Sequence, residues 1–284
     1  MIRKYHDLIM NCLLKHLILF ATACSFFSCN KDNIPDPYQP VNLPDIRRVD
    51  FISGNDSSVY IFDNDMILSN GRTNNVLGIT GFEWFTMHYS DSKLLTGATY
   101  DVARQFDARR DYYEIMYTRD ERNMLSKVDR EEWTKTLSFT YGDNYLLKQV
   151  MVRAENGYEE RYTITYSGFN VSSVEKYLNQ PNEQYIKTEY SGYEKHNPFR
   201  FLVNVFYTPL FSSTYGAVRY DNIPFGMFLS ANNPKQMTEY MKDENGEYVT
   251  TGNSATFSYE YGEDNYPILI NGGGLNLEIK YYQP

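Results

Sequence analysis

Apolar and polar residues alternate in a five-residue pattern that occurs four times between Tyr113 and Tyr190. The first, third and fifth positions are apolar or aromatic apart from Thr188, and the second and fourth are polar apart from Met116. Alternation with a period of two places these sets on opposite faces of a β-strand. The copies are Tyr113–Tyr117, Leu137–Tyr141, Tyr162–Tyr166 and Ile186–Tyr190, and a fifth is Phe257–Tyr261. The pattern therefore predicts antiparallel strands with one buried and one solvated face.

The tyrosines that close the four copies recur about every 24 residues, which indicates a repeated supersecondary unit. Return strands are predicted at Tyr145–Val152 and Val171–Tyr177, and Glu155–Tyr158 is predicted to be an Asn-Gly turn suited to a two-residue hairpin. Each period then holds two strands and two turns. The predicted fold class is mainly β: a curled antiparallel meander sheet, or an incomplete barrel, of tandem hairpins.

The flanking segments extend this sheet and interrupt it once. Short strands are predicted at Arg47–Phe51 and Ser58–Asp63, and strands with loops between Ile67 and Thr99. The segment 198–229 carries few charges and begins with an apolar stripe at helical spacing, which predicts a short helical or irregular plug on the concave face. Further hairpins are predicted at 237–284. Residues 46–284 form one β-rich domain in this interpretation, with its repeat region at 113–190.

The N-terminus has the features of an export signal. Arg3 and Lys4 precede the apolar run Leu17–Phe27, which is too short for a bilayer span. Ser28-Cys29 then resembles the lipobox of bacterial lipoproteins, with Cys24 as the alternative acylation site. This resemblance implies a signal peptide at 1–28 and an acylated (palmitate-bearing) Cys29. The prolines and polar residues of 29–45 predict an extended spacer after it.

The resemblance also implies attachment to the outer membrane through the lipid anchor only. Lys31-Asp32 resembles a signal for export to the cell surface, and a periplasm-facing position is the alternative. All three cysteines of the chain precede residue 30. Cysteine nucleophiles, cysteine zinc sites and redox motifs are therefore excluded from the β-rich domain.

Two tyrosine-rich turns resemble a known group of proteins. Tyr141-Gly-Asp-Asn144 and Tyr259-Glu-Tyr-Gly-Glu-Asp-Asn-Tyr-Pro267, with the plug between them, are similar to Bacteroidetes lipoproteins of unknown function that carry a porin-like domain. The resemblance covers residues 110–284 and implies a fold and a location, but no activity. Strands of five to eight residues and outward charges such as Glu114 and Glu260 favour a sheet that does not span a membrane.

Composition limits the function further. The net charge of −9 argues against nucleic acid as a partner, since phosphate is bound by lysine and arginine. His88 and His196 have no zinc-site spacing, and no Gly-x-Ser-x-Gly elbow is present. The adjacent carboxylates Glu131-Glu132 and Glu159-Glu160 point to opposite faces if they lie in strands, so neither predicts a glycosidase pair. We expect no enzyme activity, cofactor or metal site.

The two tryptophans, Trp84 and Trp133, are the candidate ligand-binding residues, because an exposed indole can stack on a sugar ring. A place in the core or at a sheet edge is the alternative for each. The predicted function is a non-enzymatic binding module for a glycan or an envelope partner protein. A carrier of an apolar ligand in the concave face and a glycoside hydrolase are the alternatives.

Overall fold

A computed structural model describes residues 46–64, 67–74, 82–103, 110–129, 135–179, 182–202 and 225–283. All of them belong to the compact unit Asp36–Pro284. No helix in this described part of the chain is long and apolar enough to cross a membrane.

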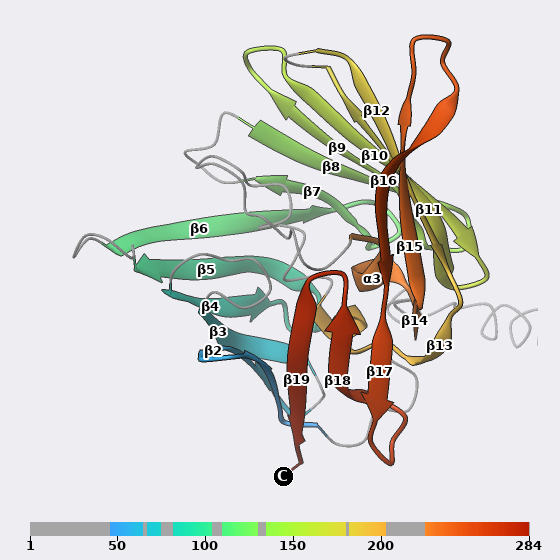
Figure 1. Ribbon diagram of the computed structural model, residues 1–284. Helices are drawn as coiled ribbons and strands as arrows, with labels where there is room; N and C mark the ends of the chain where they lie inside the picture. Colours follow the sequence, from blue (N-terminus) through green and yellow to red (C-terminus); the bar gives the residue numbers. More distant parts are fainter. Residues whose placement is uncertain are drawn as a thin grey trace, which may run out of the picture. The chain divides into compact units, whose positions relative to one another are not determined.

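Within these described ranges, seventeen strands form one antiparallel sheet (Figure 1). Those before the plug are β1 Arg48–Ser53, β2 Asp56–Phe62, β3 Leu68–Asn74, β4 Phe82–Tyr89, β5 Leu95–Ala103, β6 Arg110–Arg119, β7 Leu125–Asp129, β8 Lys135–Tyr141, β9 Leu147–Ala154, β10 Glu159–Ser167, β11 Asn170–Leu178 and β12 Gln184–Ser191. Those after it are β15 Gln236–Lys242, β16 Tyr248–Thr256, β17 Ser258–Tyr261, β18 Pro267–Gly272 and β19 Leu275–Tyr282. A separate pair consists of β13 Glu194–His196 and β14 Asn232–Asn233.

The sheet curls until its last strand pairs with its first. Strands β1 to β12 each pair with the next, β12 then pairs with β15, and Tyr282 of β19 lies opposite Arg48 of β1. Strand β16 pairs with β15, and β17 pairs with β18. Strands β16 and β17 follow one another along the chain through Phe257, and the seam of the sheet lies between them. Near this seam, the Tyr261 hydroxyl of β17 donates to Glu194 Oε1 of the separate β13–β14 pair over 3.2 Å. The predicted curled meander sheet or incomplete barrel is therefore confirmed, and the structure adds that the sheet is nearly closed with one seam.

Burial follows the alternation seen in the sequence. In β8, Leu137, Phe139 and Tyr141 are buried, while Ser138 and Thr140 are exposed. In β6 the same holds for buried Ile115 and Tyr117 and for exposed Glu114 and Met116. The alternation weakens in β12, where Tyr190 is the buried residue of the copy. The repeated tyrosines at these positions are thus part of the core.

Two local predictions are wrong. Five strands are nine or ten residues long, such as β6 with ten, because pairing continues beyond the five-residue pattern. Strand length therefore does not support the expectation that the sheet does not span a membrane. The turn after β9 has three residues, Glu155 to Gly157, because the Ala154 amide donates to Tyr158 O and only Gly157 of the three has a positive φ.

This three-residue turn recurs. In each case the first amide donates to the carbonyl four residues later, and the fourth residue, with positive φ, donates back to the first carbonyl. The described turns of this kind are 90–94, 120–124, 142–146, 154–158, 243–247 and 262–266. Asn123 and Asn265 occupy the left-handed position in two of them, which asparagine tolerates better than most residues. Turn chemistry therefore fixes the hairpin register.

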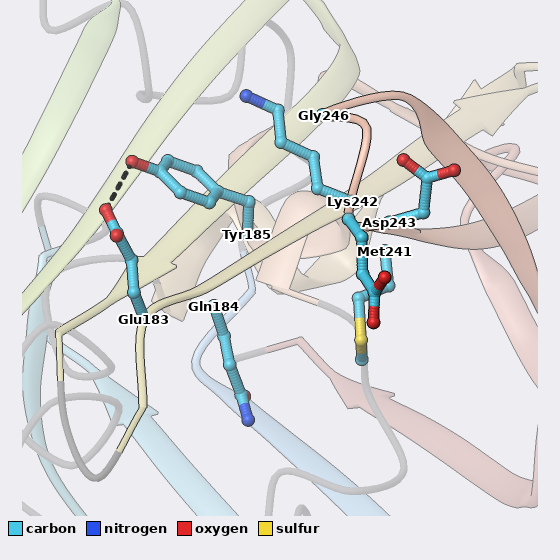
Figure 2. Close-up of a pocket in the computed structure, with 8 residues that line it drawn as sticks. Glu183, Gln184, Tyr185, Met241, Lys242, Asp243 and Gly246 are labelled. Carbon is cyan, nitrogen blue, oxygen red and sulfur yellow. Dashed lines mark hydrogen bonds between the residues drawn. The ribbon is translucent and has the colours of Figure 1, made fainter.

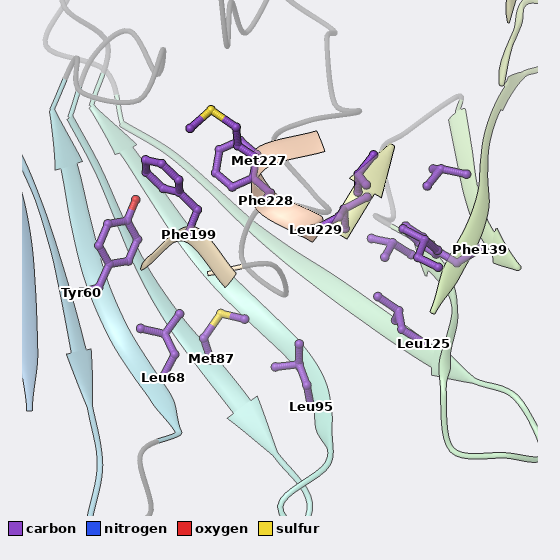
Figure 3. Close-up of a cluster of buried hydrophobic side chains, with 14 of the residues drawn as sticks. Tyr60, Leu68, Met87, Leu95, Leu125, Phe139, Phe199, Met227, Phe228 and Leu229 are labelled. Atoms are coloured by element: carbon purple, nitrogen blue, oxygen red, sulfur yellow. The ribbon is translucent and has the colours of Figure 1, made fainter. Parts of the chain in front are cut away.

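The plug packs on the concave side of the sheet. It begins with the 3-10 helix η3 Pro198–Leu202 and ends with the helix α3 Phe225–Leu229. Phe199 stacks on Phe51 of β1 at 5.5 Å between ring centroids, and it meets Phe228 of α3 at 5.4 Å. Figure 3 shows Met227, Phe228 and Leu229 between strands of the sheet. Both ends of the predicted plug are confirmed, and residues 203–224 lie outside the described part.

Candidate binding site at the rim of β12 and β15

Trp84 is the one predicted ligand-binding residue that the structure describes. It lies on β4 opposite Asp101 of β5, next to buried Phe85, and its side chain is 38% exposed on the outer face. Trp133 and Cys29 lie outside the described residues. His88 is also exposed on β4, and His196 stacks on Tyr266 at 5.1 Å. In the described ranges no three His, Cys, Asp or Glu side chains are placed to hold a metal ion.

Glu159 and Glu160 point to opposite faces of β10, as the sequence predicts. Glu160 is buried on the concave face, where it accepts hydrogen bonds from the Tyr158 hydroxyl at 2.9 Å and from Tyr162. Lys176 Nζ lies 2.7 Å from its carboxylate. Burial acts to raise the pKa of Glu160, but the charge of Lys176 and the hydrogen bonds outweigh it and lower the pKa. Glu160 is thus a charged, fully partnered side chain of the sheet.

A pocket of about 360 Å³ lies where β12 begins and β15 ends (Figure 2). The turn between β15 and β16 forms its third side. It is lined by polar and apolar groups of Glu183, Gln184, Tyr185, Met241, Lys242, Asp243, Glu244 and Gly246. We call this cavity the rim pocket.

The two strands place different side chains on each face of the rim. Ile186 is paired with Met241, and both lie on the same face as Tyr190, which contacts the plug. Tyr185 and Lys242 come one residue before and after that pair, so they lie on the outer face. Figure 2 shows Tyr185 and Lys242 extending to one side and Met241 to the other. Residues from both the outer and the concave face therefore line the rim pocket.

Hydrogen bonds and charges hold the lining in place. The Tyr185 hydroxyl donates to Glu183 Oε1 over 2.8 Å, and this bond, together with burial, raises the pKa of Tyr185. Lys242 Nζ lies 4.3 Å from the Tyr185 ring centroid, a cation–π contact. Asp243 accepts the backbone N–H groups of Glu247 and Asn245, which lowers its pKa and commits it to the turn.

The arrangement suits reversible binding of a hydroxyl-rich ligand. One aromatic ring, one amide and several carboxylates line an open pocket whose volume is within the usual size of small-ligand sites, about 300–1,000 Å³. The sequence does not single out Tyr185 or Lys242, because β12 and β15 are separated by the plug. Their pairing is known only from the register. The polar Lys187 and Glu189 of the copy Ile186–Tyr190 in β12 are the signal that indicated an exposed face.

Comparison with known proteins finds similarity in structure but not in sequence. No known protein family and no curated protein matches the chain by sequence. A porin-like protein from Bacteroides uniformis has a similar structure, with 13% identity and a TM-score of 0.45 over 86% of this chain and 99% of that one. A porin-like protein from Bacteroides vulgatus has 10% identity and a TM-score of 0.36 over 84% and 98%. The resemblance to porin-like proteins is thus seen at low identity, and the lipoprotein part of that prediction stays a prediction.

Proposed function

We propose that the protein is a cell-envelope lipoprotein whose β-rich domain binds a glycan without converting it chemically. The observation that carries the proposal is the rim pocket, with its volume of about 360 Å³. Sugar hydroxyls both donate and accept hydrogen bonds, which suits the Gln184 amide and the Glu183 carboxylate. Lys242 covers one face of the Tyr185 ring, and the apolar face of a sugar would pack against the rest of that ring.

A glycan array with the full-length chain in detergent tests the binding, followed by calorimetry on each glycan that binds. We expect Tyr185→Ala and Gln184→Ala to weaken binding about tenfold, equivalent to about 1.4 kcal/mol. Tyr112→Ala is the matched control, because it removes a tyrosine that is 67% exposed on the outer face of β6. Absence of any bound glycan at millimolar concentration, or Tyr185→Ala binding as tightly as the wild type, would contradict the proposal.

The proposed location in the cell envelope is supported by the N-terminal sequence. Acylation of Cys29 would anchor the chain in the outer membrane, with the domain at the cell surface beyond the spacer. Metabolic labelling with an alkyne analogue of palmitate in a Bacteroidetes host should label the wild type and Cys24→Ser but not Cys29→Ser. Protease added to intact cells should remove the domain. Label retained in Cys29→Ser, or full protection from protease, would reject the anchor or the surface position respectively.

Transport of an apolar ligand is a second candidate, which one observation favours. Met241 and Val249 are paired on the concave face, yet they are 39% and 48% exposed. Such side chains can contact an acyl chain. A fluorescent fatty acid should then bind the full-length chain with a Kd that Val249→Asp raises at least about tenfold. Equal affinity of the variant and the wild type would remove this candidate.

A further inference from the structure

Five side chains on the outer face form a row of cross-strand neighbours across five strands. Arg161 of β10 is paired with Tyr177 of β11, and Tyr177 with Tyr185 of β12. Lys242 of β15 lies over Tyr185 and is paired with Tyr248 of β16. Cross-strand partners point to the same face, so these residues stand side by side. We call Arg161, Tyr177, Tyr185, Lys242 and Tyr248 the outer row.

Contacts within the outer row fix the positions of its rings. The rings of Tyr177 and Tyr185 are 4.9 Å apart between centroids and inclined by 44°. Arg161 Cζ lies 4.9 Å from the Tyr177 ring centroid, and Lys242 Nζ lies 5.4 Å from that of Tyr248. A surface that is already ordered loses little side-chain freedom when a ligand binds.

The outer row continues the rim pocket in both directions. Tyr185 and Lys242 line the pocket, and Tyr177 and Tyr248 lie one strand further on either side. Neighbouring strands are about 4.8 Å apart, so five strands give the row a length of about 19 Å. A single sugar in the pocket would leave most of this length uncovered. The geometry therefore suits a chain of several sugars that runs across the strands.

The charges along the row argue for a neutral chain. Arg161 lies 3.9 Å from Glu159, and Lys187, which lies over the Tyr248 ring, is 2.6 Å from Glu189. The rim pocket adds Glu183 and Glu244 beside Lys242. Each cation therefore has a carboxylate nearby, and the surface has no excess of positive charge to attract a polyanion.

From these observations we infer that the outer row binds a linear, neutral polysaccharide with one of its sugars in the rim pocket. The inference rests on the proposed glycan-binding function and adds the class of ligand and its direction on the sheet. Tyr177 and Tyr248 become specificity residues that recognise chain length. Their contribution is absent for a ligand that fills only the pocket.

Calorimetry on the full-length chain in detergent tests the inference. The probes are oligosaccharides of one to six units derived from cellulose, laminarin, mannan and xylan, with oligogalacturonate as the anionic comparison. Affinity should increase with length up to about four units, as the row length implies. Tyr177→Ala and Tyr248→Ala should each weaken binding of the hexasaccharide about tenfold and change binding of the disaccharide less than about twofold. Tyr177→Phe should retain the wild-type affinity.

The outcomes separate the inference from the proposed function. Loss of binding in Tyr185→Ala together with wild-type hexasaccharide affinity in both Tyr177→Ala and Tyr248→Ala would overturn the row and leave the pocket as the site. Tighter binding of oligogalacturonate than of every neutral probe would overturn the neutral ligand class. Absence of binding by all probes would overturn the inference, while the glycan array would still decide the proposed function.

Discussion

Replacing Gly226 by alanine should destabilise the protein, although alanine favours a helix. Gly226 lies in α3, and its amide donates to the hydroxyl of Tyr190 over 3.1 Å. A Cβ at this position would lie 2.5 Å from Tyr190 Cε2 and 2.6 Å from Cζ. Tyr190 is only 6% exposed, so its ring has little room to move. The contact joins the fourth repeat of the sheet to the plug.

The expected magnitude combines two opposing effects. Alanine is favoured over glycine in a helix by about 1 kcal/mol. Overpacking of a filled core costs about 1–3 kcal/mol, and contacts this short belong to the upper end of that range. We therefore expect Gly226→Ala to lower the free energy of unfolding by about 2 kcal/mol. The apparent helix-stabilising change would thus be a net loss.

Urea denaturation of four proteins measures this coupling: the wild type, Gly226→Ala, Tyr190→Ala and the double variant. Without the Tyr190 ring, Gly226→Ala should be neutral or stabilising by up to about 1 kcal/mol, which gives a coupling energy of about 2–3 kcal/mol. Gly54→Ala is the control, because Gly54 has φ of 60° with no neighbour within 4 Å of a Cβ. Its cost should be the same in both backgrounds. An equal effect of Gly226→Ala with and without Tyr190 would refute the packing argument.

Three further variants test separate parts of the fold by denaturation. Phe199→Ala should lower the free energy of unfolding by about 3–5 kcal/mol, since Phe199 is fully buried against Phe51; a loss below about 1 kcal/mol would contradict its place in the core. The lowered pKa of Glu160 means that its ion pair stabilises the fold above the unfolded pKa of about 4.3 and that this contribution is lost as pH falls through the folded value. The advantage of the wild type over Glu160→Gln at pH 7 should therefore shrink below pH of about 4.3, and a constant difference would show that the ion pair does not contribute. Asn123→Val should cost about 1–2 kcal/mol, because Asn123 has φ of 61°, whereas Asn123→Gly should be close to neutral; equal costs would exclude backbone strain as the cause.

The sequence predicts the fold well where burial alternates along the chain. Leu137, Phe139 and Tyr141 are buried on one face because the period of two is fixed by strand geometry, and no distant contact is needed to see it. The ends of the plug were also predicted, since Phe199 belongs to an apolar stripe in a segment with few charges. The seam was not predicted, because it depends on where β16 and β17 change partners at Phe257.

The candidate site could not be predicted from the sequence for a related reason. Tyr185 and Lys242 are 57 positions apart in the printed numbering, and only the register between β12 and β15 brings them together. Trp84 was selected because tryptophan commonly stacks on sugars, a property of residue type alone. The tyrosines of the repeat were assigned to the core, as Tyr117 and Tyr190 confirm. Tyr177 and Tyr248 lie on the other face, outside the repeated pattern, and the sequence pattern did not distinguish them.

Binding of a glycan at the rim pocket is the central claim, and calorimetry on matched variants tests it most directly. The best ligand from the array is titrated into the wild type, Tyr185→Ala and Tyr112→Ala, each with an unchanged circular dichroism spectrum. We predict that Tyr185→Ala weakens binding about tenfold and that Tyr112→Ala binds as the wild type does. Equal Kd values for all three proteins would show that the glycan does not occupy the rim pocket.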